Sequence, residues 1–205
     1  MKYENMLREF ETRLGSVVGV DGGIDAVRRD LYRDMDPALL PDFVLPLNVV
    51  EQGYRVVYEP LARLREEALH EARSEYRMRV RVSLRAFHAL WYKRNLFNPL
   101  RYGLFSWQLF SHKLLRYFVG ILLILIFAGS FAVSRPLAWW LIAVQTVGYL
   151  AAFAGYLLQK TGRSVRILYF PFYFVLLNLA ATVAFVKFLR GEQQVTWTPR
   201  KGTGT

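Results

Sequence analysis

Three long apolar stretches in the second half of the chain constrain its fold more than any other feature. They cover residues 117–133, 136–158 and 167–186, and none contains a charged side chain. The shortest has 17 residues, which as a helix extends ~26 Å, close to the ~30 Å of a bilayer's hydrocarbon core. We therefore predict about three transmembrane helices. The alternative, core helices of a soluble protein, is disfavoured because the remaining chain has too little polar surface to cover them.

Charged residues are concentrated before these stretches. Of the 16 acidic residues, 15 precede Leu115, and 19 of the 27 lysine and arginine residues lie in 1–116. The net charge of +11 fits either nucleic acid or an anionic membrane surface. The apolar stretches favour the membrane, and we expect no nucleic-acid partner.

Basic residues flank the stretches unevenly. They are Lys113 and Arg116 before the first, Arg135 after it, and Lys160, Arg163 and Arg166 before the third. The positive-inside rule then places the charged half and the 159–166 connection in the cytoplasm of a bacterial-type inner or plasma membrane.

The residues after the third stretch conflict with this topology. Three full spans put the tail outside, yet it carries four basic residues, Lys187, Arg190, Arg200 and Lys201. Two explanations remain open. Either the third stretch does not cross fully, with Pro171 as a break, or the charges of the tail are overruled.

Residues 1–95 predict a mixed α/β domain. Residues 3–14 have the apolar spacing of an amphipathic helix, and 15–32 predict strand, turn and helix. Asp42 is placed to cap a helix over 43–52 that Gly53 ends, before the strand YRVVY. Three further segments complete the layout: a charged helix over 63–95, an interfacial segment over 96–116, and a polar tail over 189–205.

Four motifs follow one another in the first half. They are GSVVGVDGGIDAVRR at 15–29, the helix-opening Asp42, GYRVVYEP at 53–60, and Arg79 with Arg81. In this order they resemble the family 2 membrane glycosyltransferases, which include cellulose, hyaluronan and poly-N-acetylglucosamine synthases. The resemblance covers about residues 3–115 and concerns the acceptor-binding, C-terminal half of that family's GT-A-like α/β catalytic domain.

The resemblance implies that Asp42 is the general base that takes the proton of the acceptor hydroxyl. Such a base must be ionised and within hydrogen-bond reach of that hydroxyl. We expect the helix N-terminus to keep its pKa low. A plain helix-capping aspartate is the alternative reading.

The resemblance also implies that Arg79 and Arg81 bind the departing nucleoside diphosphate, because the planar guanidinium pairs with two phosphate oxygens. A solvated or headgroup-facing basic helix is the alternative. Possible acceptor contacts are Asp21, Gly22 and Gly23.

Three positions depart from the family's pattern. Pro41 replaces a glutamate, Met78 a glutamine, and Val82 the tryptophan that supports the end of a growing glycan. Val82 cannot stack on a sugar in that way, which argues against processive polymerisation.

Metal binding is expected outside this chain. Asp34 and Asp36 have the D-x-D form of a metal motif, but they follow a helical stretch rather than a hydrophobic strand. In the family, the nucleotide-binding half holds Mg²⁺ or Mn²⁺. We expect the chain to be a fragment or subunit that works with a missing N-terminal half or partner.

The expected function is transfer of a sugar, with inversion, from a nucleotide-sugar donor to a hydroxyl acceptor, a lipid or glycan, at the cytoplasmic membrane face. The alternative is a non-catalytic membrane assembly or docking protein that retains part of the fold.

Overall fold

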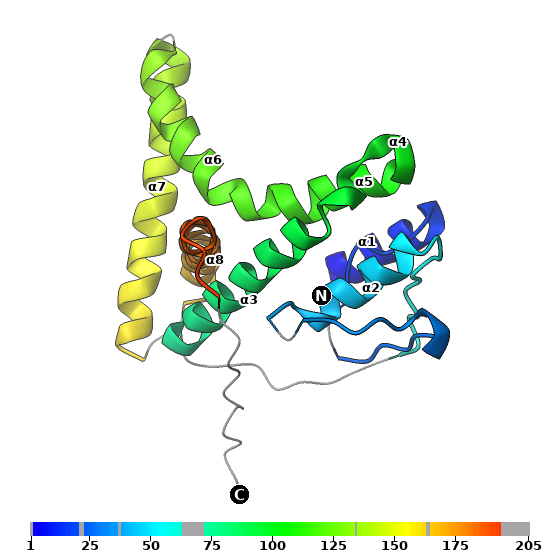
Figure 1. The fold of residues 1–205 in the computed structure, drawn as a ribbon. Coiled ribbons are helices and arrows are strands. Elements are labelled where there is room, and N and C mark those ends of the chain that lie inside the picture. Colours follow the sequence, from blue (N-terminus) through cyan, green and yellow to red (C-terminus); the bar gives the residue numbers. More distant parts are fainter. Residues whose placement is uncertain are drawn as a thin grey trace, which may run out of the picture.

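The computed structural model describes residues 2–20, 23–36, 38–62, 72–133, 135–162 and 165–193. Their regular elements are all helical (Figure 1). In chain order they are α1 (Lys2–Leu14), η1 (Arg29–Leu31), α2 (Pro41–Glu51), α3 (Ala72–Tyr92), η2 (Arg94–Phe97), α4 (Pro99–Tyr102), α5 (Leu104–Leu109), η3 (Phe110–Leu114), α6 (Leu115–Gly129), η4 (Ser130–Ala132), α7 (Arg135–Lys160) and α8 (Arg166–Leu189).

The prediction of an α/β, GT-A-like domain is wrong, because the described residues contain no β-strand. The two segments expected as strands are extended and meet at one point. The Val17 N–H donates to the Val56 carbonyl (2.9 Å), and the Val56 N–H donates to Ser16 Oγ (2.9 Å). An isolated pair of extended segments is marginal without further strands beside it, so the contact does not develop into a ladder.

Of the helices expected in the first half, the one within 15–32 is absent apart from the short η1 turn, and the others are present with different ends. The amphipathic helix over 3–14 is confirmed as α1. Helix α2 begins at Pro41, whose missing N–H is no loss in a first turn, so Asp42 lies inside that turn and does not cap it. Gly53 has a φ of +85° and follows the end of α2, as expected. Of the long helix expected over 63–95, α3 is described, and residues 63–71 lie outside the described part.

The core of the first half forms around α2. Val44 and Leu47 are fully buried and belong to one cluster with Ala86 and Ala89 of α3. The buried Lys93 forms an ion pair with Glu51, which joins the C-terminal ends of α3 and α2. Helix α2 is therefore held against α3, and the position of its first turn is set.

Three helical runs are long and apolar enough to cross a membrane: Leu104–Ala132, Arg135–Lys160 and Arg166–Leu189. They identify the chain as a membrane protein, as the sequence predicted. The first run begins earlier than expected, because α5 and the π-helical η3 continue directly into α6. Figure 1 shows that the run bends near the α6 label, a short way beyond η3. A π-helical turn interrupts the regular hydrogen-bond ladder and is a common cause of such bends.

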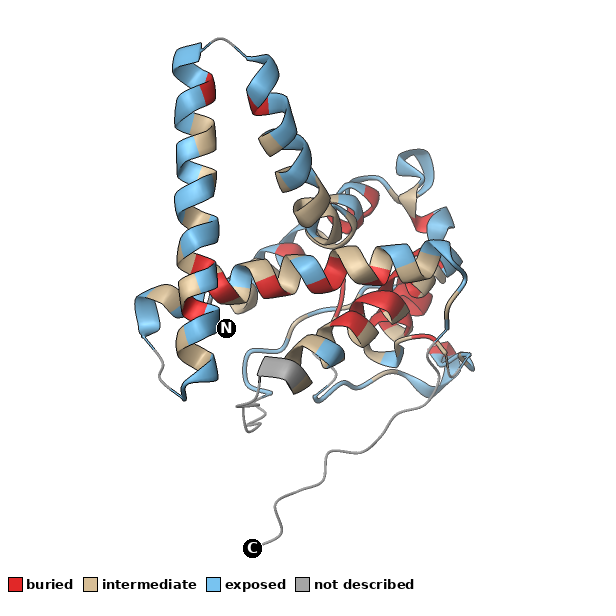
Figure 2. Cartoon of the chain, turned by 90° about the vertical axis from the view of Figure 1, so that its left-hand side faces the viewer, coloured by how far each residue is buried: buried red, intermediate tan, exposed pale blue. Residues whose placement is uncertain are grey.

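Helices α6 and α7 form a hairpin that opens away from its tip at Ser130–Ala132 (Figure 2). Helix α8 crosses the open end of this hairpin and packs against α3, α6 and α7. Phe87 of α3 is the centre of the junction. Its ring lies 5.2 Å from Tyr117, 5.3 Å from Phe185 and 5.8 Å from Phe188, measured between ring centroids. Each such pair adds about 0.5–1.5 kcal/mol beyond simple burial.

The crossing of α7 and α8 depends on a glycine. A Cβ atom placed on Gly155 would lie 2.4 Å from the Leu168 carbonyl oxygen and 2.9 Å from Phe172 Cβ. Both distances are too short for a real contact. The Leu168 carbonyl belongs to the backbone of α8, so it can move away only if the helix itself shifts.

We predict that Gly155→Ala lowers the free energy of unfolding by about 1–3 kcal/mol, the usual range for overpacking. Thermal unfolding in lipid nanodiscs measures the change. Gly148→Ala is the matched control, because Gly148 is on the same helix with no neighbour within 4 Å of its Cβ position. Equal stability of the two variants would contradict this description of the crossing.

Candidate functional site

Asp42 occupies the first turn of α2. This end of α2 faces α3 and η3. The Asp42 side chain is half-buried, and its carboxylate forms no ion pair with any other described residue. The N-terminal cap of α2, Leu40, makes no side-chain capping hydrogen bond. The plain capping role considered from the sequence is therefore not the one that Asp42 has here.

The electrostatic environment of Asp42 is mixed. Burial raises the pKa of its carboxyl group, and this effect outweighs the hydrogen bond from its own backbone N–H and the positive charges of Arg85 and Lys113, which lower it. The exposed carboxylate of Asp25 adds a smaller upward contribution. The expectation of a low pKa is thus wrong in direction. Loss of hydration disfavours the ionised carboxylate more strongly than the backbone hydrogen bond and the nearby positive charges favour it.

Lys113 reaches this site from the π-helical η3. Its amine lies over the ring of Phe43, 5.4 Å from the centroid, and a Cβ on Gly19 would be 2.9 Å from the same nitrogen. Gly19 therefore leaves the space that the lysine side chain fills. No described carboxylate lies within ion-pair distance of this amine. Single π-helical turns are frequent where a side chain is positioned for function.

Arg85 holds the backbone that leads into α2. Its guanidinium donates to the carbonyl oxygens of Ala38 (3.2 Å) and Leu39. Burial lowers its pKa, and the nearby charge of Arg81, one helical turn away, lowers it further. Arg81 and Arg85 therefore lie on the same side of α3 as the start of α2.

Arg79 has a different position. Its Nε donates to Glu75 Oε1 (2.8 Å) and its Nη2 donates to the Tyr173 hydroxyl of α8 (2.9 Å). The same hydroxyl donates to Glu75 (2.8 Å). Burial acts to lower the pKa of Arg79, but the bonds to these two partners outweigh it and raise the pKa. Arg79 thus connects α3 to α8 and does not lie with Asp42.

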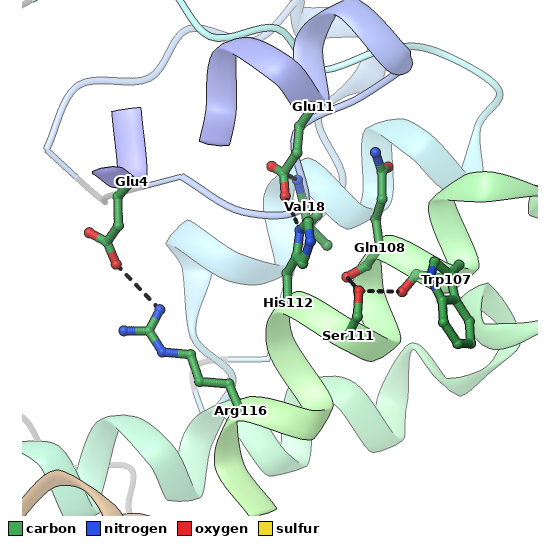
Figure 3. Close-up of polar contacts among 8 residues, drawn as sticks. All are labelled: Glu4, Glu11, Val18, Trp107, Gln108, Ser111, His112 and Arg116. Atoms are coloured by element: carbon green, nitrogen blue, oxygen red, sulfur yellow. Dashed lines mark hydrogen bonds and ion pairs between the residues drawn. The ribbon is translucent and has the colours of Figure 1, made fainter. Parts of the chain in front are cut away.

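A polar network fixes α1 and η3 relative to one another (Figure 3). Glu11, only 5% exposed, accepts a hydrogen bond from the Val18 N–H (3.2 Å) and lies 2.6 Å from His112 Nδ1. Closer to the start of α1, Arg116 donates to Glu4 (3.3 Å). The network therefore positions the segment that contains Gly19 next to the turn that carries Lys113.

The remaining predicted residues do not complete the site. Gly23 is exposed, while Asp21 and Gly22 lie outside the described residues. Asp36 accepts a hydrogen bond from the Ala38 N–H (2.8 Å), so it shapes the turn before α2. Within the described ranges, no group of three His, Cys, Asp or Glu residues is placed to hold a metal ion.

Sequence reasoning missed Arg85 and Lys113 as site residues. Arg85 follows Arg81 by four positions, so their shared helix face was available from spacing alone. Lys113 was counted only as a topology signal, because its approach to Phe43 joins segments 70 residues apart in sequence.

No family model, no curated protein and no solved structure matches this chain.

The raised pKa of Asp42 leads to a prediction about stability. The folded state binds a proton more readily than the unfolded chain does, so the ionised carboxylate opposes folding above the raised pKa. Asp42→Asn should therefore raise the unfolding temperature at neutral pH. The gain should shrink as the pH falls through the raised pKa toward 3.8, the ordinary value. Asp34→Asn, at an exposed position, is the control, and an Asp42→Asn protein less stable than wild type at neutral pH would contradict the prediction.

The Glu11 network leads to a second prediction about stability. Glu11→Ala removes the acceptor of the Val18 N–H and the partner of His112, which should cost about 1–3 kcal/mol of unfolding free energy. Glu9→Ala, at an exposed position of the same helix, should change it little. Chemical unfolding in detergent micelles compares the two, and similar losses would show that the network does not stabilise α1.

Proposed function

We propose that this protein takes part in glycosyl transfer at the membrane surface. In this proposal a sugar passes from a nucleotide-sugar donor to the hydroxyl group of a lipid or lipid-linked acceptor. The proposal keeps the function implied by the family 2 resemblance, on a helical scaffold, and adds Arg85 and Lys113 to the residues that carry it.

The observation that carries the proposal is the position of the Asp42 carboxylate near two basic side chains, Arg85 and Lys113. This half-buried carboxylate forms no ion pair within the described part of the chain, and the charges of Arg85 and Lys113 act on it. Ionisation of this carboxyl group lowers the stability of the folded state, because burial raises its pKa. Groups with such perturbed pKa values are concentrated at functional sites. A raised pKa also suits a base, because a more basic carboxylate accepts a proton more readily.

The proposed reaction is a direct displacement with inversion. Asp42 takes the proton of the acceptor hydroxyl while that oxygen forms a bond to the anomeric carbon. The bond between this carbon and the diphosphate oxygen breaks, and the leaving nucleoside diphosphate keeps the electron pair. One carboxylate is sufficient for the protein's part in the proton transfer.

Arg85 beside Asp42, and Arg81 next to Arg85, suit the charge that develops on the leaving group. Arg81 and Arg85 lie one helical turn apart, and paired guanidinium groups bind two phosphate groups well. Arg79 is already bonded to Glu75 and Tyr173, so we assign it to the joint between α3 and α8. The diphosphate role thus moves from Arg79 and Arg81 to Arg81 and Arg85, with Lys113 as a third cation.

The location favours an acceptor that is held at the membrane. Lys113 directly precedes α6, a candidate membrane-spanning helix, so a hydroxyl beside Asp42 lies near the bilayer surface. The described residues offer no cluster for the Mg²⁺ or Mn²⁺ of the family, and no step above depends on a metal in this chain. The proposal therefore includes a partner subunit or further segment that binds the nucleotide.

The test uses membranes of the source cell, with each substitution made in the chromosome and any partner subunit retained. Membranes are incubated with radiolabelled nucleotide sugars, and label is counted in the lipid extract. Asp42→Asn should reduce transfer by roughly 100-fold or more, the usual contribution of a catalytic base. The KM for the acceptor should change little.

The controls separate chemistry from folding. Asp34→Asn should leave transfer unchanged, and Arg85→Lys should retain part of the rate that Arg85→Gln loses. Transfer by Asp42→Asn at the wild-type rate, with the protein present at normal abundance, would disprove the role of the base. If transfer then also depended on the chain's presence, the result would support the non-catalytic docking protein.

A further inference from the structure

We infer that α8 lies along the membrane surface and does not cross the bilayer. Only the α6–α7 hairpin then spans, and the described residues that follow α8, as far as Gln193, lie on the same side as the charged first half. The partner of the exposed apolar side of α8 is the bilayer itself. The inference rests on packing and does not depend on the proposed function.

Helix α8 contacts the hairpin at two glycines, one on each arm. Near its N-terminus, Leu168 lies against Gly155 of α7, and further along, Thr182 lies against Gly120 of α6. These two glycines lie at the open end of the hairpin, each five residues, or ~8 Å, from the end of its helix.

The length of α8 between these two contacts shows how it is directed relative to the hairpin. Between Leu168 and Thr182 the helix advances ~21 Å. A helix that crossed beside the hairpin would climb by that distance toward the tip. Along the two arms, Gly120 lies ~15 Å nearer the tip than Gly155, which is less than this advance, and Figure 2 shows α8 passing across the splayed arms rather than along them.

The charged helix α3 gives an independent reason. Tyr173 bonds to Glu75 near one end of the contact, and the Glu192 carbonyl lies 2.9 Å from His88 Nε2 near the other. Helix α8 therefore contacts α3 at both ends of the interface, and Figure 1 shows the two helices crossing at an angle. If α8 crossed the bilayer, the part of α3 between these contacts would have to enter it.

Such a crossing is prohibitive for α3. Between its two contacts with α8 it carries four arginines, Arg77, Arg79, Arg81 and Arg85. Charged side chains inside the hydrocarbon region are strongly unfavourable, and four in one helix exceed what pairing with a single glutamate offsets.

The sides of α8 fit the membrane surface. Ala180 and Ala184 are buried against α3, while Ile167, Phe174 and Val186 are exposed. Helical spacing places these three on the side turned away from α3. The basic Arg166, Lys187 and Arg190 lie at the ends of α8, where phospholipid headgroups attract them. A helix in the membrane surface has this arrangement of an immersed apolar side with basic residues beside it.

The bilayer is the occupant because the hairpin determines where it lies. Helices α6 and α7 present apolar side chains on nearly all sides, and only 11% of the most apolar window of each run is buried. Helix α8 crosses directly at the base of this lipid-facing hairpin. The conflict between three spans and a basic tail then disappears, because the basic residues return to the side they favour.

The chain has no cysteine, so single cysteines report one position each. We would introduce Glu9→Cys in α1, Val133→Cys at the hairpin tip and Gln193→Cys after α8. The full-length protein is reconstituted in sealed vesicles, sorted by orientation, and treated with a membrane-impermeant maleimide before or after permeabilisation.

The expected result is that Glu9→Cys and Gln193→Cys react from one side and Val133→Cys from the other. Reaction of Gln193→Cys together with Val133→Cys would show that α8 crosses and would overturn the inference. Reaction of all three from one side would overturn it too, because the hairpin would then not span.

A depth measurement checks the same inference without the tail. Nitroxide labels at Ile167→Cys, Phe174→Cys and Val186→Cys are compared in their collisions with oxygen and with a water-soluble nickel complex. A surface helix gives all three a similar shallow depth, whereas a spanning helix places position 174 clearly deeper than the other two. Val147→Cys, at an exposed position midway along α7, is the reference for the bilayer centre.

Discussion

The packing of α8 along α3 is the interaction on which the rest of this structure depends. It joins a helix that is almost free of charge to one that carries several arginines, and it places both against the base of the α6–α7 hairpin. Phe87 lies at the meeting point of α3, α6 and α8 and is almost completely buried. Because aromatic rings fill this junction, the water-facing half and the membrane helices are held in one arrangement.

This packing also divides the arginines of α3 between two tasks. Arg79 faces α8, where Glu75 and Tyr173 hold its guanidinium, while Arg81 and Arg85 face the start of α2. Two residues along a helix correspond to roughly 200° of rotation, so Arg79 and Arg81 point to nearly opposite sides. The same spacing that looks like a paired motif in the sequence therefore separates the pair in space.

Asp42 shows how burial competes with a helix terminus. The α2 N-terminus favours the ionised carboxylate, but the cluster of α2, α3 and the segment before α2 removes enough water to reverse the balance. The amine of Lys113 and the guanidinium of Arg85 compensate only partly. An ionised carboxylate in such an environment lowers the free energy of unfolding. This is the physical reason to connect Asp42 with a function rather than with stability.

Several elements could be predicted from local sequence. Helix α1, the helix that contains Asp42, the turn at Gly53 and the three apolar helices all follow from spacing, chain length and residue type. The two strands could not be judged in the same way. A β-branched run is extended in this structure, yet a sheet requires neighbouring strands that the described residues do not supply. Arg85 shares a helix face with Arg81 and was accessible to the same reasoning, whereas Lys113 was not.

The sequence by itself determined that the protein has a charged half and apolar helices that belong in a membrane, because run length and charge are local properties of the chain. Only the tertiary structure decided which cations surround Asp42 and how α8 lies relative to the hairpin. Those outcomes depend on contacts between segments far apart in sequence, such as Lys113 with Phe43 and α8 with Gly120 and Gly155. Hydropathy describes how apolar a helix is, whereas its direction in the membrane is set by the helices against which it packs.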